Sequence, residues 1–368
     1  MKFRCQKNDI VQAIQIVMKA VSTKPQTPIL SGIYMKAADN QLVLQAMDYE
    51  IGIICNIEAE VEIPGEIVIV GRYAQEVVRR LPGSTVDFEY NSQEKMVYIK
   101  SNRSKFSFLS MNAADYPTIN RVQGNHNFQI ADVTLKDLIA NTSFACSHEE
   151  SRPVFTGCLL ELKNDAIVMA ATDTHRLAVK SDTIEDFQGE QKLIIPAKLL
   201  NELLKILQSD MPRSVNICCS QTQISFEVDN VYISSRLIEG QFPDYHRVIP
   251  LEFKTNITMK TDEIKGIIDR IALISRTNDY NVVTMEFASS MVKISSANPE
   301  IGDGEEYAGA VIDGEDIRIS FNADYINDAL KLIKSEEFTI ALNGPLSSVC
   351  IRTEKDPNFT YIVTPVRS

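Results

Sequence analysis

The stretch PILSGIYMKAADNQLVLQAMD at residues 28–48 recurs as PVFTGCLLELKNDAIVMAATD at residues 153–173. In each copy an apolar alternation is interrupted by a short polar run, Ala-Asp-Asn-Gln or Lys-Asn-Asp, which predicts a strand, a tight turn and a second strand. The repeat holds at an offset of 125 residues without a gap, as three identities show: Pro28 with Pro153, Gly32 with Gly157, and Asp48 with Asp173. The chain therefore repeats one structural unit.

A third copy lies a further 125 residues along, with similarity in pattern rather than identity. Glu161 in CLLEL aligns with Glu286 in VTMEF, and IVMAATD aligns with VKISSAN. One polar position recurs as Asp48, Asp173 and Asn298. We expect this side chain to make a hydrogen bond at a turn or strand end, because short polar side chains there bond to the nearby backbone.

Two amphipathic helices flank each predicted strand pair, with apolar residues at i, i+3, i+4 and i+7. The first helices are IVQAIQIVMKAV after Asn8 or Asp9, LKDLIANTSFA after Asp132 or Thr134, and EIKGIIDRIALI after Thr261 or Asp262. The second helices are RYAQEVVRRL (72–81), AKLLNELLKIL (197–207) and ADYINDALKLI (323–333). A meander of three short strands closes each copy, so each unit is expected to be α+β with two helices on an antiparallel sheet.

The repeat predicts three tandem domains at residues 1–125, 126–252 and 253–368. Three such units in a row resemble a curving solenoid, with the helices on one side. The two ends of an arc differ chemically, so self-association would be head-to-tail, and head-to-tail contacts close into a ring where the rotation allows. We therefore expect each chain to form part of a ring.

Charge is distributed unevenly along the 368 residues. The formal net charge is −12, with +1 in residues 1–125, −6 in 126–251 and −7 in 252–368. This balance argues against a protein that grips nucleic acid over its whole surface. Basic Arg103 and Lys105 lie in the first third, and acidic residues gather in the last. These charges either attract each other across a head-to-tail contact or are simply solvated. The acidic residues are Glu300, Asp303, Glu305 and Glu306.

Several other classes of protein are not indicated. The polar start MKFRCQKNDI is not a signal peptide, and no run reaches the roughly 18 apolar residues of a membrane span, which predicts a cytoplasmic protein. Seven scattered cysteines indicate reduced, mostly buried thiols. The scattered histidines His126, His148 and His246 do not indicate a metal site. The glycine-rich GDGEE at 302–306 lacks the Lys-Ser/Thr of a phosphate loop, so no metal or cofactor is expected.

An enzyme remains the alternative of a different class. Asp173 and His175 are two residues apart, so on a strand they would share a face, as an acid–base pair does. No nucleophile motif accompanies them, and the equivalent positions Asp48 and Asn298 have no histidine two residues on. A turn hydrogen bond is therefore favoured over catalysis.

Six motifs together carry a resemblance that covers the whole chain. They are the opening MKF, TPIL at 27–30, AADYP at 113–117, ATDTHRLAV at 171–179, GQFPDY at 240–245, and PVR at 365–367. At these spacings the chain resembles the bacterial DNA polymerase III β subunits, or sliding clamps. The resemblance implies three clamp domains, and a head-to-tail homodimeric ring around duplex DNA without enzymatic activity. It also implies three kinds of partner: the α subunit of the replicative polymerase, the clamp loader, and other proteins with a clamp-binding motif.

The resemblance also implies site residues. A peptide-motif cleft between the central and C-terminal domains would comprise Phe155, Thr172, Thr174, His175, Arg176, Leu177, Pro243, Arg247, Val248, Leu346, Ser348, Ile362, Thr364, Pro365, Val366 and Arg367. DNA-facing residues would be Lys24, Arg72, Arg79, Arg103 and Lys198. The dimer interface would contain Arg103, Lys105, Leu273, Ile274, Glu300, Asp303, Glu305 and Glu306. Thr364, where the family often has a larger apolar residue, and the final Ser368 depart from the family pattern.

Overall fold

The computed structural model describes residues 1–22, 26–124, 126–185, 187, 189–208, 211–275 and 281–366. These residues form two compact units. The first comprises Met1–Val133 and Asn201–Leu237, and the second comprises Thr134–Leu200 and Ile238–Ser368. The central third of the chain is therefore divided between the two units, and each unit is described below by itself.

Helices and strands follow the same order in all three thirds of the chain, except that the described residues of the second third form no counterpart of β5 or β22. The first third holds β1 (Lys2–Gln6), α1 (Lys7–Val17), β2 (Gly32–Ala38), β3 (Gln41–Met47), β4 (Ile51–Glu58), β5 (Glu60–Ile63), β6 (Gly65–Val70), α2 (Gly71–Arg80), β7 (Thr85–Asn91), β8 (Met96–Ser101) and β9 (Ser104–Leu109). The second holds β10 (His126–Ala131), α3 (Asp132–Thr142), β11 (Gly157–Lys163), β12 (Ala166–Thr172), β13 (Arg176–Thr183), β14 (Glu190–Pro196), α4 (Ala197–Ile206), β15 (Ser214–Cys219), β16 (Gln223–Val228) and β17 (Val231–Arg236). The third holds β18 (Thr255–Lys260), α5 (Thr261–Ser275), β19 (Val282–Ala288), β20 (Met291–Asn298), β21 (Gly302–Gly309), β22 (Val311–Asp313), β23 (Ile317–Asn322), α6 (Ala323–Leu332), β24 (Glu337–Leu342), β25 (Val349–Arg352) and β26 (Phe359–Val363).

The repeated strand–turn–strand is confirmed in all three copies as β2–β3, β11–β12 and β19–β20. The helices also form where the periodicity predicts them. Helix boundaries differ by a few residues: α1 begins at Lys7, α3 at Asp132 and α5 at Thr261, so Asn8 and Asp9 lie inside the first turn of α1 instead of capping it. The preceding residue, Gln6, is extended and makes no side-chain cap.

The recurring polar position makes the expected turn hydrogen bonds. In each copy its side-chain oxygen accepts backbone N–H groups two or three residues on, a standard way for Asp and Asn to close a turn. Asp48 Oδ1 accepts from Glu50 at 2.8 Å and Ile51 at 2.7 Å, Asp173 Oδ1 accepts from His175 and Arg176 at 3.0 Å each, and Asn298 Oδ1 accepts from Glu300 at 2.9 Å. The prediction of a structural role for this position is confirmed.

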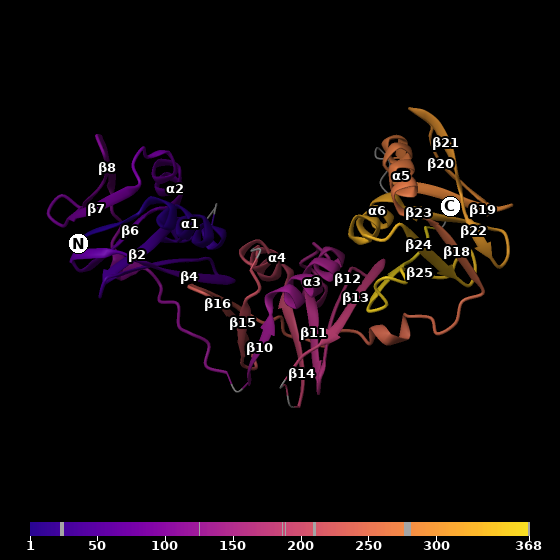
Figure 1. Ribbon diagram of the computed structural model, residues 1–368, viewed down its shortest axis with the longest axis horizontal. Helices are drawn as coiled ribbons and strands as arrows, with labels where there is room; N and C mark the ends of the chain where they lie inside the picture. The colour runs from indigo at the N-terminus through magenta and orange to yellow at the C-terminus, as the bar shows by residue number, and fades with distance from the viewer. Residues whose placement is uncertain are drawn as a thin grey trace. The chain divides into compact units, whose positions relative to one another are not determined.

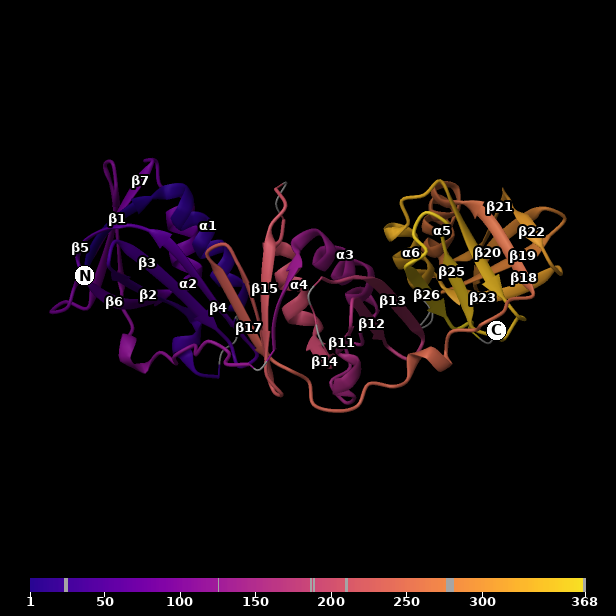
Figure 2. The same cartoon turned by 60° about the horizontal axis from the view of Figure 1, so that its bottom comes forward.

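Apolar helix faces cover the sheets within each unit. In the first unit α1 lies beside α2 and packs on β3 and β4, burying Ile10, Ala13, Ile14 and Val17 (Figures 1 and 2). In the second unit α5 lies beside α6 and packs on β19, β20 and β21. Both helices of each pair thus present polar faces away from the strands they cover.

The described strands form four sheets, two in each unit. The first unit contains the sheets β5-β1-β7-β8-β9 and β10-β15-β16-β17-β4-β3-β2-β6, and the second contains β14-β11-β12-β13-β26-β25-β24-β18-β22 and β21-β20-β19-β23. Each long sheet contains strands from two different repeats. The repeats are joined by the pairing of β17 with β4 in one sheet and of β13 with β26 in the other. Pairing of this kind satisfies strand edges that would otherwise be open.

The two joining ladders differ in chemistry. Positions Ile51 and Cys55 on β4 are buried and apolar, whereas the equivalent positions on β13 are Arg176 and Lys180. The Lys180 side chain is only 7% exposed, and its ammonium group binds Asp137 on α3 at 2.9 Å and Asp356 at 2.6 Å. The second ladder is therefore reinforced by buried ion pairs that tie β13 to its surroundings.

The cysteines are mostly buried, as the sequence predicts. All seven thiols are free, and all are buried except the half-buried Cys218. Within the described residues, no helix is both long and apolar enough to cross a membrane.

Replacing Lys180 with Met should lower stability by about 2 kcal/mol, because two carboxylates lose the cation that they share. Burial disfavours the charged form of Lys180, but hydrogen bonds to Asp356 and Asp137 outweigh it and raise its pKa above the ordinary 10.5. Its contribution is therefore complete below that value and is lost as pH rises through the higher folded-state pKa. Thermal unfolding should show a wild-type advantage at pH 8 that shrinks at strongly alkaline pH.

Lys163→Met is the matched control for this substitution. Lys163 pairs with Glu190 at 3.5 Å, but both side chains are more than half exposed, so little stability should change. Equal losses in the two variants would contradict a special role for the buried lysine.

Candidate functional site

A cavity opens on the second unit where the ladder of β13 and β26 meets the segment Ile238–Phe253. It holds about 620 Å³ of free space, open solvent at its mouth included. We call it the junction cleft and define it by twelve lining residues. These are Phe155, Thr172, Thr174, His175, Arg176, Leu177, Phe242, Pro243, Tyr245, Val248, Ile362 and Thr364.

The floor of the junction cleft is apolar and is formed by residues of the second and the third repeat. Leu177 on β13 is the register partner of Ile362 on β26, and both are buried. Phe155 and Phe242 meet edge to face above them, with ring centroids 6.4 Å apart. Val248 adds an apolar side chain that is 47% exposed. Such a hollow offers anchor sites to apolar side chains of a ligand.

The polar side of the cleft is the turn that joins β12 and β13. Thr172 Oγ1 accepts from Thr174 N at 3.0 Å and donates to Arg176 O at 2.6 Å. Thr364 fastens the C-terminal segment to this turn, because both its N–H and its hydroxyl donate to His175 O at 2.9 Å. Thr174 adopts a positive φ of 80°, which a threonine takes only where its surroundings hold it there.

Arg176 lines the cleft, but its guanidinium group is fully engaged in the fold. It donates to Asp173 at 3.0 Å, to Asp328 on α6 at 2.7 Å and to Phe144 O at 2.8 Å. It also lies over the Tyr325 ring, 4.6 Å from the centroid. Arg176 therefore braces the cleft wall, and the part it offers to a ligand is limited.

The geometry does not favour the enzyme alternative. Asp173 and His175 lie in the turn before β13, not side by side on a strand, and the Asp173 carboxylate is occupied by backbone N–H groups and by Arg176. The His175 ring stacks with Tyr325, at a centroid distance of 6.4 Å. Within the described part of the chain, no three His, Cys, Asp or Glu side chains gather as metal ligands would.

Ten of the sixteen residues predicted for the cleft line the cavity, and Phe242 and Tyr245 line it in addition. Both belong to the GQFPDY motif, so the sequence signal for them was present. Five predicted residues are described but do not line the cavity, and Arg367 lies outside the described residues. Those five are Arg247, Leu346, Ser348, Pro365 and Val366.

Two of these five residues interact with other parts of the fold, one through an ion pair and one through a backbone hydrogen bond. Arg247 pairs with Asp244 at 3.0 Å while its side chain stays 85% exposed, and Val366 N donates to Ser320 O at 2.8 Å. Leu346 is an exposed apolar side chain, 68% accessible.

The residues predicted to face DNA are surface cations. Arg72 and Arg79 lie on α2, Lys198 lies on α4 and Arg103 lies in the turn between β8 and β9, all exposed, and Lys24 lies outside the described residues. Arg79 is 3.4 Å from Glu76 on the same helix, so part of its charge is balanced locally.

The residues predicted for the dimer interface lie at two sheet edges and one helix end. Arg103 and Lys105 flank the start of β9, and Leu273 and Ile274 lie in the last turn of α5. Glu300 precedes β21, and Asp303, Glu305 and Glu306 lie on β21. Glu305 pairs with Lys293 and Glu306 with Arg270, each at 2.6 Å within the same chain. These hydrogen bonds lower the pKa of both carboxyl groups and keep them ionised.

Three family models match the chain in succession. They describe the N-terminal, central and C-terminal domains of the DNA polymerase III beta subunit, at residues 1–120, 129–244 and 246–367. The Beta sliding clamps of Bacillus subtilis and Staphylococcus aureus are 36% and 32% identical to this chain, and each match covers all of both proteins.

Solved structures give the same result. The crystal structure of the Bacillus subtilis DNA polymerase sliding clamp has a TM-score of 0.94 at 34% identity, and covers 100% of this chain and 99% of that one. The DNA polymerase III subunit beta of Pseudomonas aeruginosa has a TM-score of 0.94 at 28% identity, with all of both chains covered. The chain therefore belongs to the DNA polymerase III beta subunit family, and it is a sliding clamp, a non-catalytic processivity factor of DNA replication.

Proposed function

We propose that two copies of this clamp join head to tail into a ring that encircles duplex DNA. The ring would tether the replicative DNA polymerase through its α subunit, and the clamp loader and other clamp-motif proteins would use the same junction cleft. A protein with this task works on the chromosome, so we place it in the bacterial cytoplasm. The observation that carries the proposal is a pair of open sheet edges.

Two ladders join different thirds of the chain, and a third ladder of the same kind could form between two strands that now lie at sheet edges. The last strand of the second third, β17, pairs with β4, the strand after the repeated hairpin of the first third. In the same way, the last strand of the third third, β26, pairs with β13, the strand after the hairpin of the second third. The remaining members of this series are β9 and β21, and each ends its sheet. A β9–β21 ladder between two chains would complete the series, and two such ladders would close a ring.

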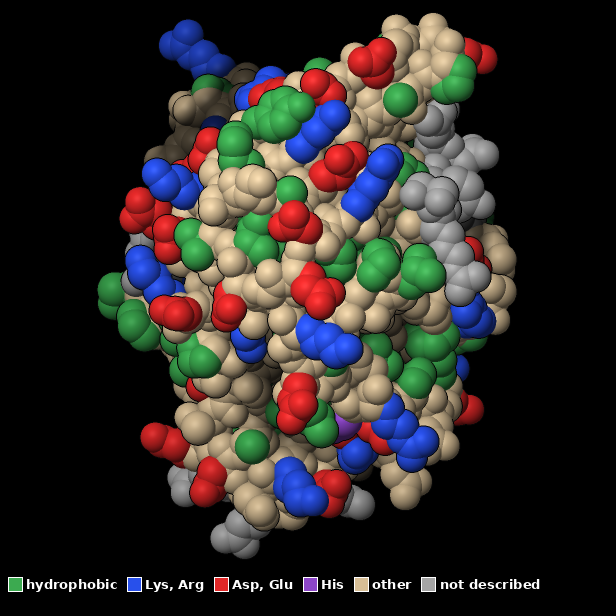
Figure 3. Space-filling model, turned by 90° about the vertical axis from the view of Figure 1, so that its right-hand side faces the viewer, with side chains coloured by type: hydrophobic (Ala, Val, Ile, Leu, Met, Phe, Trp, Pro, Cys, Tyr) green, Lys and Arg blue, Asp and Glu red, His purple; other side chains and the backbone are tan. Residues whose placement is uncertain are grey.

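Both edges have the chemistry of an interface. Phe106 and Leu109 on β9 are 44% and 71% exposed, and Ile301 and Tyr307 around β21 are 56% and 54% exposed. The face in Figure 3, at the third-domain end of the chain, shows small groups of apolar side chains among acidic and basic ones. Exposed apolar edges invite strand pairing, and the opposite charges near β9 and β21 favour a head-to-tail orientation.

The charges also suit a protein that slides. Arg72 and Arg79 on α2 and Lys198 on α4 are exposed cations on a chain with a formal net charge of −12. Few phosphate contacts give weak, sequence-independent binding, whereas many would hold the protein in place and make binding strongly dependent on salt. Retention on DNA would then depend on the closed ring.

Retention should depend on the topology of the DNA. Clamp loaded by its loader and ATP onto nicked circular DNA should elute with the DNA in gel filtration, and should be lost when a restriction enzyme linearises the circle. The physical reason is that a ring can slide off an end but not off a circle. Equal retention on circular and linear DNA would rule out encirclement.

The proposed ladder has a defined register. Position 55 pairs with Val231, and position 180 pairs with Phe359, the first residue of its strand in each case. Position 306 should therefore oppose Ser104, the first residue of β9, because Cys55, Lys180 and Glu306 pair with the equivalent residues Leu44, Met169 and Ile294 of the preceding strand. Ser104→Cys combined with Glu306→Cys should form a disulfide-linked species of twice 41.2 kDa on mild oxidation, because opposed Cβ atoms in a ladder lie about 5 Å apart.

Ser104→Cys with Glu305→Cys is the matched control for the cross-link. Neighbouring residues on a strand point to opposite faces, so this pair should link poorly. Cross-linking of the control alone, or a purely monomeric mass at micromolar concentration, would contradict the proposed interface.

Removing residues 364–368 should abolish peptide binding and leave the ring intact. Thr364 is part of the cleft wall and fastens the C-terminal segment to His175, while β9 and β21 lie elsewhere in the fold. The probe is the tightest binder among overlapping peptides that tile the polymerase α subunit of the same organism. Fluorescence anisotropy measures its binding, and sedimentation measures the dimer. Full binding by the truncated clamp would show that the site is elsewhere.

A further inference from the structure

Tyr245 belongs to two neighbouring cavities at once. Its ring lines the junction cleft and packs in the apolar cluster with Leu177, Phe242 and Ile362. The second cavity is lined by residues 240–246 together with Glu161 and Lys192, neither of which lines the junction cleft. The residue therefore connects the wall of the cleft to groups that a ligand in the cleft does not meet.

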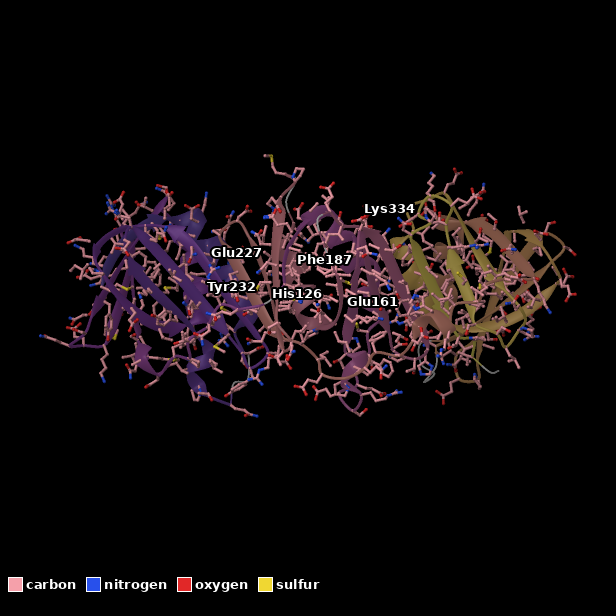
Figure 4. The ribbon with its side chains drawn as sticks, turned by 90° about the horizontal axis from the view of Figure 1, so that it is seen from below. His126, Glu161, Phe187, Glu227, Tyr232 and Lys334 are labelled. Atoms are coloured by element: carbon pink, nitrogen blue, oxygen red, sulfur yellow. The ribbon has the colours of Figure 1, made fainter. Side chains whose placement is uncertain are left out.

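A short polar chain extends from the Tyr245 hydroxyl away from the cleft. The hydroxyl donates to Glu161 Oε2 at 2.6 Å, and Lys192 Nζ binds Glu161 Oε1 at 2.6 Å. Glu161 on β11, labelled in Figure 4, is the register partner of Lys192 on β14. The Glu161 side chain is only 15% exposed, so its hydrogen bonds are shielded from water.

The segment that carries Tyr245 is a connection without regular strands. It is fastened near its ends, where Ile238 N donates to Ile194 O at 2.9 Å and Lys254 N donates to Leu342 O at 3.2 Å. Near its middle it forms the turn Tyr245–Arg247, and Val248 N donates back to Tyr245 O at 3.0 Å. The position of Tyr245 therefore sets where Val248 lies at the mouth of the cleft.

We propose that Glu161, held by Lys192, is a positioning residue for peptide binding: it fixes Tyr245 and thereby the wall that Tyr245, Pro243 and Val248 present to a bound peptide. The proposal rests on the proposed function of the cleft. It adds a residue outside the ligand's reach that tunes affinity by pre-organising the site.

The hydrogen-bonded series Tyr245–Glu161–Lys192 has the chemistry needed to hold Tyr245 in place. Burial alone would raise the pKa of Glu161, but hydrogen bonds from Lys192 and Tyr245 outweigh it and lower the pKa, so the carboxylate remains an acceptor at neutral pH. A charged acceptor makes a stronger hydrogen bond than a neutral one. The His246 ring stacks on the Tyr245 ring at 4.2 Å and restrains its orientation further.

The test is a double-mutant cycle read out by peptide binding. Tyr245→Phe keeps the ring in the cleft and removes the hydroxyl, and Glu161→Ala removes the acceptor without touching the cleft. Each should weaken binding of the probe peptide about tenfold, mainly through faster dissociation. The double variant should be no weaker than either single one, because both act through the same hydrogen bond.

Lys163→Ala is the matched control. Lys163 and Glu190 form a neighbouring cross-strand ion pair on the same two strands, and neither contacts Tyr245. This variant should bind the probe peptide within about twofold of the wild type. All variants should keep the wild-type sedimentation, because the edges β9 and β21 are unchanged.

Hydrogen–deuterium exchange without peptide separates failure of the support from failure of the proposed function. Glu161→Ala and Tyr245→Phe should speed exchange in residues 240–248, and Lys163→Ala should not. If the wild type binds no peptide, the proposed function of the cleft fails, and exchange alone decides the role of Glu161. Unchanged exchange in both variants, or additive losses of binding, would overturn the proposal.

Discussion

An open strand edge must find a partner, and the architecture of this clamp follows from how its edges are satisfied. A repeat unit of about 125 residues supplies enough strands for a sheet, yet each long sheet is assembled from strands of two different repeats. The pairing of β13 with β26 matters most, since it brings Leu177 beside Ile362 and so creates the floor of the junction cleft. Without that ladder, the turn at His175 and the C-terminal segment would have no reason to meet.

The two joining ladders are held by different chemistry, and the junction cleft lies at the second of them. Around β4 the equivalent positions are apolar, and the ladder with β17 is closed by ordinary core packing. Around β13, Arg176 and Lys180 need carboxylates, which come from Asp328 and Asp356 in the last third of the chain and from Asp137 on α3. Buried cations fix partners more specifically than apolar contacts do, because an unpaired buried charge is costly. The polar side of the cleft is thus a by-product of how this junction is fastened.

Features formed within one stretch of the chain could be predicted from the sequence, whereas contacts between distant stretches could not. The hairpins, the helices and the turn role of Asp173 follow from periodicity and from short-range hydrogen bonds. The division of each third between two sheets is invisible in the sequence, because strand partners are chosen by non-local packing. For the cleft, the resemblance supplied most of the lining. It did not show that Arg176 is engaged by the fold, that Leu346 lies outside the cavity, or that Glu161 supports Tyr245 from behind.

One strand position illustrates how divergence of the copies divides the work among them. Residues 55, 180 and 306 are equivalent in strand register, and they are Cys, Lys and Glu. The cysteine is buried in an apolar ladder, and the lysine is buried among carboxylates, so both belong to permanent junctions. Glu306 is partly exposed and pairs with Arg270 of its own chain. A junction between separate copies must present a surface that is stable in water before the partner arrives. A solvated, locally paired carboxylate meets that requirement, whereas a buried unpaired charge would not.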